Sequence, residues 1–156
     1  MKAITIKQPW ATLIALGEKR FETRSWQTKY RGQIAIHAGK SIDKEACEDT
    51  WIKSTLAEHG IRSYKDLPTG AVLAIAEIQD CHKVVTNFCN QIAITTGPGI
   101  SGLEIKFGDY TEGRFAWELD NIKTLPSPVD AKGKLSLWEW DHADEAKRGN
   151  KEGTAL

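Results

Sequence analysis

A change of hydrophobic period at Gly17 constrains this chain more than any other feature. Before it, residues 9–16 carry apolar side chains at helical spacing, which predicts a short amphipathic helix beginning at Pro9. Gly17 suits the end of that helix, because glycine adopts the left-handed backbone conformation at little steric cost. After it, residues 20–26 alternate with a period of two, which predicts a strand. The chain therefore turns from a helix almost directly into a strand.

The predicted strand has one face that is almost wholly ionic. Side chains two residues apart lie on the same side of a strand at about 7 Å, so Glu22 falls between Arg20 and Arg24. Lys19 stands at the edge of the same group. We therefore predict a cationic crevice between the helix and the strand, with one carboxylate inside it. The alternative is a solvated strand face, whose surface ion pairs each contribute about 0–1 kcal/mol.

Four residues form the spaced pattern G-x-K-x-x-E-x-R: Gly17, Lys19, Glu22 and Arg24. This pattern resembles the signature of the ASCH domain, named for its homology to the activating signal cointegrator. The resemblance continues through IKQPWATLIALG before the signature and RSWQTKYRGQIAIHAGK after it. The later segments AVLAIAEIQDC and RFAWELDNIKTLPSPVDAKGKLSLWEW also resemble that family, so the likeness covers residues 3–140. It implies a PUA-like β-barrel, a fold group widely used to hold RNA and modified bases.

The rest of the chain is typical of short strands with few helices. We predict an α+β fold, a small mixed PUA-like β-barrel of about six strands with two or three helices packed against it. The lack of a repeated strand-helix-strand rhythm argues against a doubly wound sheet. Residues 1–141 are expected to form this domain and residues 142–156 a polar tail. The predicted strands are residues 3–7, 20–26, 33–38, 71–81, 114–122 and 135–141, and the predicted helices are 9–16 and 43–59.

Three local expectations follow from the same patterns. Trp51 falls on the apolar side of helix 43–59, so it is expected in the core. The segment LPSPVDAKGK is expected to be a connector, and the strand after it to place Leu135 and Leu137 on one face. The run GPGISG at 97–102 matches G-x-G-x-x-G, but the residues after it show no helical period. We therefore reject a dinucleotide site and expect a loop there, which could act as a lid.

Length and composition are those of one ordinary globular domain, with 156 residues that are 40% hydrophobic and 27% charged. No apolar run is long enough for a signal peptide or a membrane span, so a cytoplasmic protein that does not bind membranes is expected. Cys47, Cys81 and Cys89 form neither a C-x-x-C pair nor an even disulfide set. This suits a reducing compartment and predicts no metal site. We expect a monomer without a cofactor.

Charge is distributed unevenly along the chain. The formal net charge is zero, yet residues 1–40 carry eight basic residues against two acidic ones. A neutral protein with a positive first quarter is typical of one that meets an anionic partner locally. Phosphate is the obvious candidate for that partner.

Our first hypothesis is that the chain binds RNA, another single-stranded nucleic acid, or a nucleoside-like small molecule. Aromatic residues predicted to stack on bases are Trp26, Tyr30 and Tyr110. Glu22 could accept a hydrogen bond from an exocyclic amine. The predicted nucleic-acid-binding residues are Gly17, Lys19, Arg20, Glu22, Arg24, Trp26, Lys29, Tyr30, Arg31, His37 and Lys40.

The second hypothesis is an enzyme, because the resemblance also covers small bacterial amidohydrolases that deacetylate N4-acetylcytidine and relatives assigned ribonuclease activity. The lysine of that family's site matches Lys19, whereas its threonine position is Glu22 here. Thr23 is predicted to face the other side of the strand. Such chemistry would use Lys19 as a base with a lowered pKa, and Glu22 or Glu77 as a proton relay.

Two alternatives remain open beside these hypotheses. Glu77 interrupts the apolar strand 71–81, and it could instead pair there with a basic residue, because a buried carboxylate needs a partner. The whole domain could also be a protein-interaction adaptor, as the name of the cointegrator suggests.

Overall fold

One mixed sheet forms the framework of the molecule. The computed structural model describes residues 1–86, 92–94, 99–100 and 102–141. Its strands are ordered β2-β6-β4-β3-β1-β7, and β5 pairs with β4 outside this path. Strands β1 and β3 run parallel, and the other paired strands are antiparallel. The bounds are β1 Lys2–Gln8, β2 Phe21–Arg24, β3 Gly32–Ile42, β4 Ala71–Thr86, β5 Ile92–Ile94, β6 Phe115–Asp130 and β7 Leu137–Glu139.

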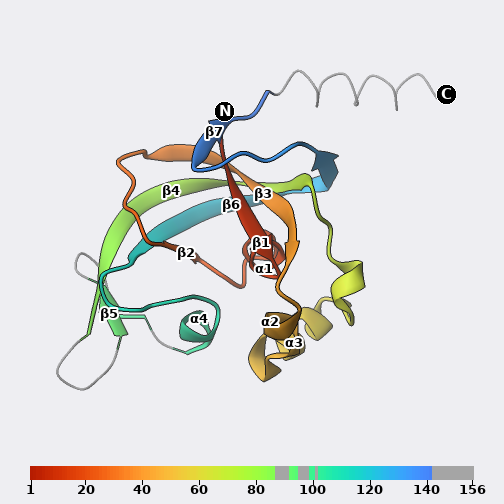
Figure 1. The fold of residues 1–156 in the computed structure, drawn as a ribbon, viewed down its shortest axis with the longest axis horizontal. Helices are drawn as coiled ribbons and strands as arrows, with labels where there is room; N and C mark the ends of the chain where they lie inside the picture. The colour runs from red at the N-terminus through yellow and green to blue at the C-terminus, as the bar shows by residue number, and fades with distance from the viewer. Residues whose placement is uncertain (87–91, 95–98, 101, 142–156) are drawn as a thin grey trace.

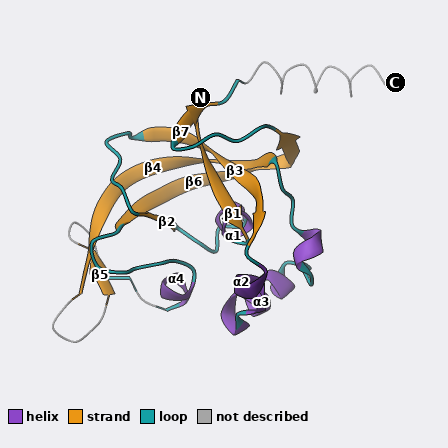
Figure 2. Cartoon of the chain, viewed as in Figure 1, coloured by secondary structure: helices purple, strands orange, loops and turns teal. Residues whose placement is uncertain are grey.

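The helices are short and pack beside this sheet (Figure 2). They are α1 Trp10–Ala15, α2 Lys44–Glu48, α3 Thr50–Glu58 and α4 Leu103–Lys106, with a single 3-10 turn at Tyr64–Asp66. The predicted α+β class with a mixed sheet is therefore confirmed. None of the described helices is long and apolar enough to cross a membrane.

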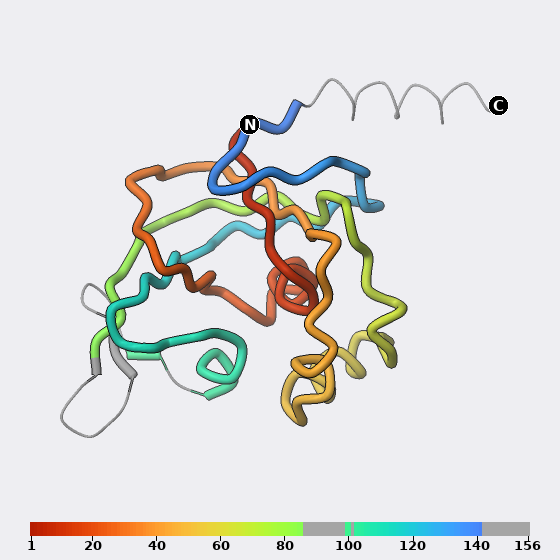
Figure 3. Tube along the Cα trace, in the orientation of Figure 1, coloured from red at the N-terminus to blue at the C-terminus, as the bar shows by residue number. Residues whose placement is uncertain are grey.

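The sheet curves like a barrel but does not close. The long strands β4 and β6 run side by side along a curved path (Figure 1). The sheet order leaves β2 at one edge and β7 at the other, with no ladder between them among the described residues. Figure 3 shows the chain before β7 returning across the N-terminal end of β1. Within the described part of the chain, strand β7 pairs only with residues 2–4 of β1, so the later part of β1 has no ladder partner on that side. We call the gap between this part of β1 and β2 the seam.

Both faces of β3 are buried. Ile34 and Ile36 lie in the main core with Ile14 of α1. Ala35, on the opposite face, lies in a second core that contains Trp138 and Trp140. A strand covered on both sides lies in the interior of the fold, and residues 34–39 of β3 form this buried part.

The first helix ends as predicted. Gly17 has φ of +79°, a conformation that strains other residues far more than glycine. Past it, the backbone amides of Glu18 and Lys19 both donate to Leu13 O, at 3.0 and 3.1 Å. These bonds close the end of α1 and direct Lys19 back under the helix rather than into solvent.

The predicted helix over 43–59 is two helices, because Asp49 interrupts it. Asp49 has an extended ψ of 132°, and its side chain accepts hydrogen bonds from Trp51 N and Ile52 N, which starts α3 anew. The break rotates the apolar side of the second helix. Ile52 and Leu56 are buried, whereas Trp51 is 50% exposed, so the prediction of a core Trp51 was wrong.

The prolines of the predicted connector lie inside β6. Val72 pairs with Val129 and Ala74 with Thr124, so the register shifts across the four residues 125–128. A proline has no backbone N–H to donate, and it is tolerated here because residues 125–128 have no paired partner in the β4–β6 ladder. The strand therefore continues to Asp130.

The last strand is shorter than predicted. Ser136 has a positive φ of 57°, which breaks the alternation before β7 begins. Leu135 is consequently 94% exposed and does not share a buried face with Leu137.

The glycine-rich run is described only in part, because residues 97, 98 and 101 lie outside the described residues. After Gly102 the chain forms the single turn α4, so the expectation of no helix there was wrong. Cys89 and the predicted tail 142–156 also lie outside the described residues.

Candidate functional site

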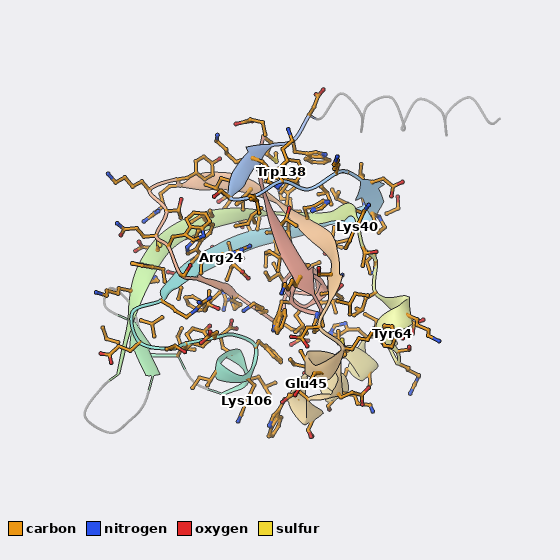
Figure 4. The ribbon with its side chains drawn as sticks, viewed as in Figure 1. Arg24, Lys40, Glu45, Tyr64, Lys106 and Trp138 are labelled. Atoms are coloured by element: carbon orange, nitrogen blue, oxygen red, sulfur yellow. The ribbon has the colours of Figure 1, made fainter. Side chains whose placement is uncertain are left out.

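A cavity of about 470 Å³ lies at the seam, and we call it the seam cavity. Arg24 of β2 spans the gap here, because its Nη2 donates to Thr5 O of β1 at 2.7 Å. Figure 4 shows Arg24 toward the centre of the molecule and Lys40 near the end of β3. The cavity is lined by residues 5–7, 22–24, 39–41, 107–109 and 134–136, together with Trp10, Lys19 and Arg114.

Lys19 forms the buried end of the seam cavity. Its side chain is 1% exposed, and Nζ donates to Phe107 O at 2.7 Å. Burial lowers the pKa of Lys19 from its ordinary value, because a charged ammonium loses its hydration. The carboxylates of Glu22 and Glu104 oppose that shift, and the Arg24 charge adds to it. Lys19 is therefore a desolvated amine next to acidic groups.

Glu22 and Arg24 lie on the same side of β2, as their spacing predicts. Glu22 is 8% exposed, and its Oε1 lies 3.1 Å from Arg24 Nε. Both side chains line the seam cavity beside Lys19. Three of the four signature residues, Lys19, Glu22 and Arg24, thus converge in one hollow, whereas Gly17 does not line it.

Residues 107–109 form the wall opposite β2. Asp109 N donates to Thr23 Oγ1 at 3.1 Å. Arg114 then ties this wall to the strand, because its Nε donates to Asp109 O at 3.1 Å and its Nη2 to Thr23 O at 3.2 Å. Thr23 lines the cavity, although its alternation in the strand predicts that it faces away.

Glu104 of α4 anchors the same wall to β2. Its carboxylate accepts hydrogen bonds from the backbone amides of Arg20 and Phe21, at 3.0 to 3.1 Å. Arg20 immediately precedes β2 and Phe21 is its first residue. The Glu104 carboxylate thus serves as the hydrogen-bond acceptor for these two amides at the start of the strand. Through this contact α4 holds Phe107 over Lys19.

Several predicted binding residues lie outside the cavity. Trp26 packs edge-on against Trp117, with ring centroids 4.8 Å apart. Arg31 pairs with Asp80 at 3.1 Å. Tyr110 is 6% exposed, and burial and the Glu104 carboxylate raise its pKa. Of the predicted set, those that line the seam cavity are Lys19, Glu22, Arg24 and Lys40, and those that do not are Gly17, Arg20, Trp26, Lys29, Tyr30, Arg31, His37 and Glu77.

Glu77, the predicted proton relay, lies elsewhere on β4. Its Oε2 accepts hydrogen bonds from Gln79 Nε2 and Asn121 Nδ2, both at 3.2 Å. These partners are amides rather than the basic residue that was the alternative. Among the described residues no group of three or more histidine, cysteine or acidic side chains is arranged to hold a metal ion.

Sequence reasoning missed several lining residues that come from distant segments: Lys7, Trp10, Asp109, Arg114 and Lys134. Trp10 and Phe107 are the aromatic residues of the lining. No local pattern marks these residues, because only the curvature of the sheet brings them to the seam.

The fold and the seam define a small protein with a curved, open mixed sheet of the PUA-like type. The sequence-family model of the ASCH domain matches residues 4–128 of this chain. The chain belongs to the ASCH domain family. That membership suggests a role in binding RNA.

Two curated relatives support the assignment. Over 152 residues the chain is 35% identical to mouse activating signal cointegrator 1, covering 96% of this chain and 24% of the relative. Over 80 residues it is 35% identical to the human cointegrator, covering 50% of this chain and 14% of the relative. The chain thus spans about a quarter or less of the curated relatives that it matches.

Solved structures of ASCH proteins share the fold. The ASCH protein of Zymomonas mobilis superposes with a TM-score of 0.53 and 14% identity, covering 96% of this chain and 93% of that one. A single-residue mutant of the same protein gives a TM-score of 0.52, with 96% of both chains covered and again 14% identity. At this identity the likeness concerns the fold alone.

Proposed function

We propose that this chain binds RNA or another single-stranded nucleic acid through the seam cavity. The observation that carries the proposal is the convergence of Lys19, Glu22 and Arg24 in one hollow of about 470 Å³. A hollow with convergent polar groups is the usual form of a ligand site. The opening of the sheet between β2 and β1 gives the ligand access to it.

The charge of the cavity supports an anionic ligand. With Lys19 counted as protonated, six cationic side chains line it against two carboxylates, in a chain whose formal net charge is zero. Lys7 and Lys40 are exposed at its rim, where they can meet phosphate oxygens. The cationic residues are Lys7, Lys19, Arg24, Lys40, Arg114 and Lys134, and the acidic ones are Glu22 and Asp109.

The interior offers contacts that suit a base. Trp10 lines the cavity and is half-buried, so its ring can contribute stacking, which is worth about 1–3 kcal/mol per base. Glu22 keeps a second carboxylate oxygen beyond the one near Arg24, and this oxygen can accept from an exocyclic amine. Phosphates outside and a base inside are consistent with a single strand rather than a duplex.

The test is equilibrium binding of fluorescently labelled single-stranded RNA, followed by anisotropy at several salt concentrations. We expect affinity to fall with salt, and Lys7→Ala to weaken binding and to reduce the slope of log K against log salt by about 0.7. Lys65→Ala is the matched control, because Lys65 is exposed and does not line the cavity. Binding that is independent of salt, or equally affected by both substitutions, would refute the proposal.

The hydrolase alternative is not favoured, although the lowered pKa of Lys19 meets one of its requirements. Glu22 occupies the position that the resemblance gives to threonine, and its carboxylate is engaged by Arg24. Glu77 is not among the lining residues. Incubation with N4-acetylcytidine and with labelled RNA, followed by product analysis, would detect either hydrolytic activity directly. Product that disappears in Lys19→Ala would favour the enzyme over the binding module.

A further inference from the structure

A second cavity of about 830 Å³ lies next to the seam cavity. Its walls include residues 37, 39 and 40 of β3 and residues 130–135, which run on from the end of β6. The proposed function assigns no ligand to this cavity, although two of its cationic residues, Lys40 and Lys134, line both cavities. Its size is within the range of pockets that hold small organic ligands.

The two cavities are continuous along one surface. Five residues line both of them: Thr5, Gly39, Lys40, Lys134 and Leu135. Lys40 of β3 and Lys134, which precedes β7, both line this shared border. A ligand that fills the seam cavity and extends beyond it therefore passes both lysines.

The second cavity carries its own positive charge. Lys40, Lys132 and Lys134 are all exposed, and Asp130 is the carboxylate among its lining residues. Lysine ammonium groups suit phosphate as point charges that tolerate a range of orientations. Leu135, 94% exposed at the shared border, adds an apolar surface that a nucleobase or a sugar can cover.

The floor of the second cavity is fixed by neutral hydrogen bonds. His37 Nε2 lies 2.7 Å from Ala131 O, and its Nδ1 lies 3.1 Å from Thr5 Oγ1. Because a carbonyl can only accept, Nε2 carries the proton and Nδ1 accepts from the Thr5 hydroxyl. Trp138 Nε1 in turn donates to Thr5 Oγ1 at 3.1 Å. The imidazole is therefore engaged on both nitrogens.

Gly133 lets the cavity wall approach this floor. A Cβ at Gly133 would lie 2.6 Å from Thr5 Oγ1 and 2.7 Å from His37 Cε1, which is too close for any other residue. The backbone of residues 131–135 is thus held against β1 and β3. This holds Lys132 and Lys134 in place on either side of the glycine.

We propose that the second cavity is a subsite for the neighbouring nucleotide, so that the ligand is an oligonucleotide rather than a free nucleoside or mononucleotide. The inference rests on the proposed function, because it extends the strand that the seam cavity is proposed to bind. In this arrangement the seam cavity takes a base, the lysines at the border face the phosphodiester that follows it, and Lys132 meets the next phosphate.

The experiment separates the two cavities by ligand length. Unlabelled uridine monophosphate and an oligouridylate of about four nucleotides compete with labelled single-stranded RNA for the full chain. Lys7→Glu alters a residue that lines only the seam cavity, and Lys132→Glu alters one that lines only the second cavity. Lys65→Glu is the control for a charge reversal elsewhere, and circular dichroism checks that each variant is folded.

We expect the oligouridylate to bind at least about ten-fold more tightly than the mononucleotide to the unmodified chain. Lys132→Glu should weaken the oligouridylate about five-fold and leave the mononucleotide unchanged, whereas Lys7→Glu should weaken both. Equal affinity for the two ligands, or equal effects of Lys132→Glu on both, would overturn the inference. If RNA binds and responds to Lys7→Glu but not to Lys132→Glu, the inference fails while the proposed function stands. If no ligand binds, both fail.

Discussion

Arg24 reaches across the open seam of the sheet and donates through Nη2 to the main-chain oxygen of Thr5 at 2.7 Å. The same guanidinium lies 3.1 Å from Glu22 through Nε. One side chain therefore joins the edge strand β2 to β1 across the seam and also compensates a buried carboxylate. Arg24, a signature residue that lines the proposed binding site, is thus also part of the framework.

Arg24→Ala should lower stability markedly. The substitution removes the bond to Thr5 and leaves Glu22, which is 8% exposed, without one of its two cationic neighbours. We expect a loss of about 2–3 kcal/mol in the free energy of unfolding, measured by urea denaturation.

The control for Arg24→Ala is Arg20→Ala, because Arg20 is exposed and does not line the cavity. It should change stability by less than about 0.5 kcal/mol. Adding Glu22→Gln to Arg24→Ala should restore part of the loss, since the carboxylate that lost Arg24 is then neutral. A single variant Arg24→Ala as stable as Arg20→Ala would contradict the bridging role.

Lys19 should make stability rise with pH in the alkaline range. Burial lowers its pKa in the folded protein below the ordinary value of 10.5. Between the folded and unfolded pKa values, the unfolded chain binds more protons, so the free energy of unfolding increases as the pH rises through that window. Below the folded pKa, the cost of burying the ammonium is present in full.

The measurement is the difference in unfolding free energy between the unmodified chain and Lys19→Met across neutral and alkaline pH. Methionine has a similar volume and does not titrate, and the loss of the bond to Phe107 O adds a constant offset. The free energy of unfolding of the unmodified chain should rise relative to that of Lys19→Met as the pH approaches 10.5. A difference that does not change with pH would show that Lys19 keeps its ordinary pKa.

The parts of this site that the sequence predicts are those set by neighbouring residues. Gly17 requires a turn, and a period of two places Glu22 and Arg24 on one side of a strand. Both relationships span a few residues and do not depend on how the sheet curves. They are sufficient to locate the candidate site on β2.

The rest of the site depends on contacts between segments far apart in the chain. Phe107 reaches Lys19 from 88 positions away, and Arg114 reaches Thr23 from 91 positions away. Predictions of burial from hydrophobic periodicity are also wrong where the backbone departs from regular geometry. This happens at Asp49, after which Trp51 is exposed, and at Ser136, next to which Leu135 is exposed. Such departures depend on capping and positive φ, which hydrophobic spacing does not reveal.

Glu104→Ala should loosen the wall opposite β2. The carboxylate accepts from the amides of Arg20 and Phe21, so its removal leaves both amides without this partner and frees α4. We expect hydrogen exchange at these two amides to quicken and the free energy of unfolding to fall by about 1–2 kcal/mol. Glu112→Ala, an exposed acidic residue outside the cavity lining, is the control. Unchanged exchange at both amides would show that the contact does not persist in solution.

His37 should make stability fall as the solution becomes acidic. Burial lowers its pKa below 6.5, with the bond to Ala131 O opposing the shift. Below 6.5 the unfolded chain takes up a proton before the folded chain does, so the free energy of unfolding decreases with falling pH. His37→Gln keeps a donor for Ala131 O but does not titrate, so the unmodified chain should lose stability relative to this variant from pH 6.5 downward. A His37 imidazole that titrates at or above 6.5, followed by NMR, would contradict this account of the second cavity.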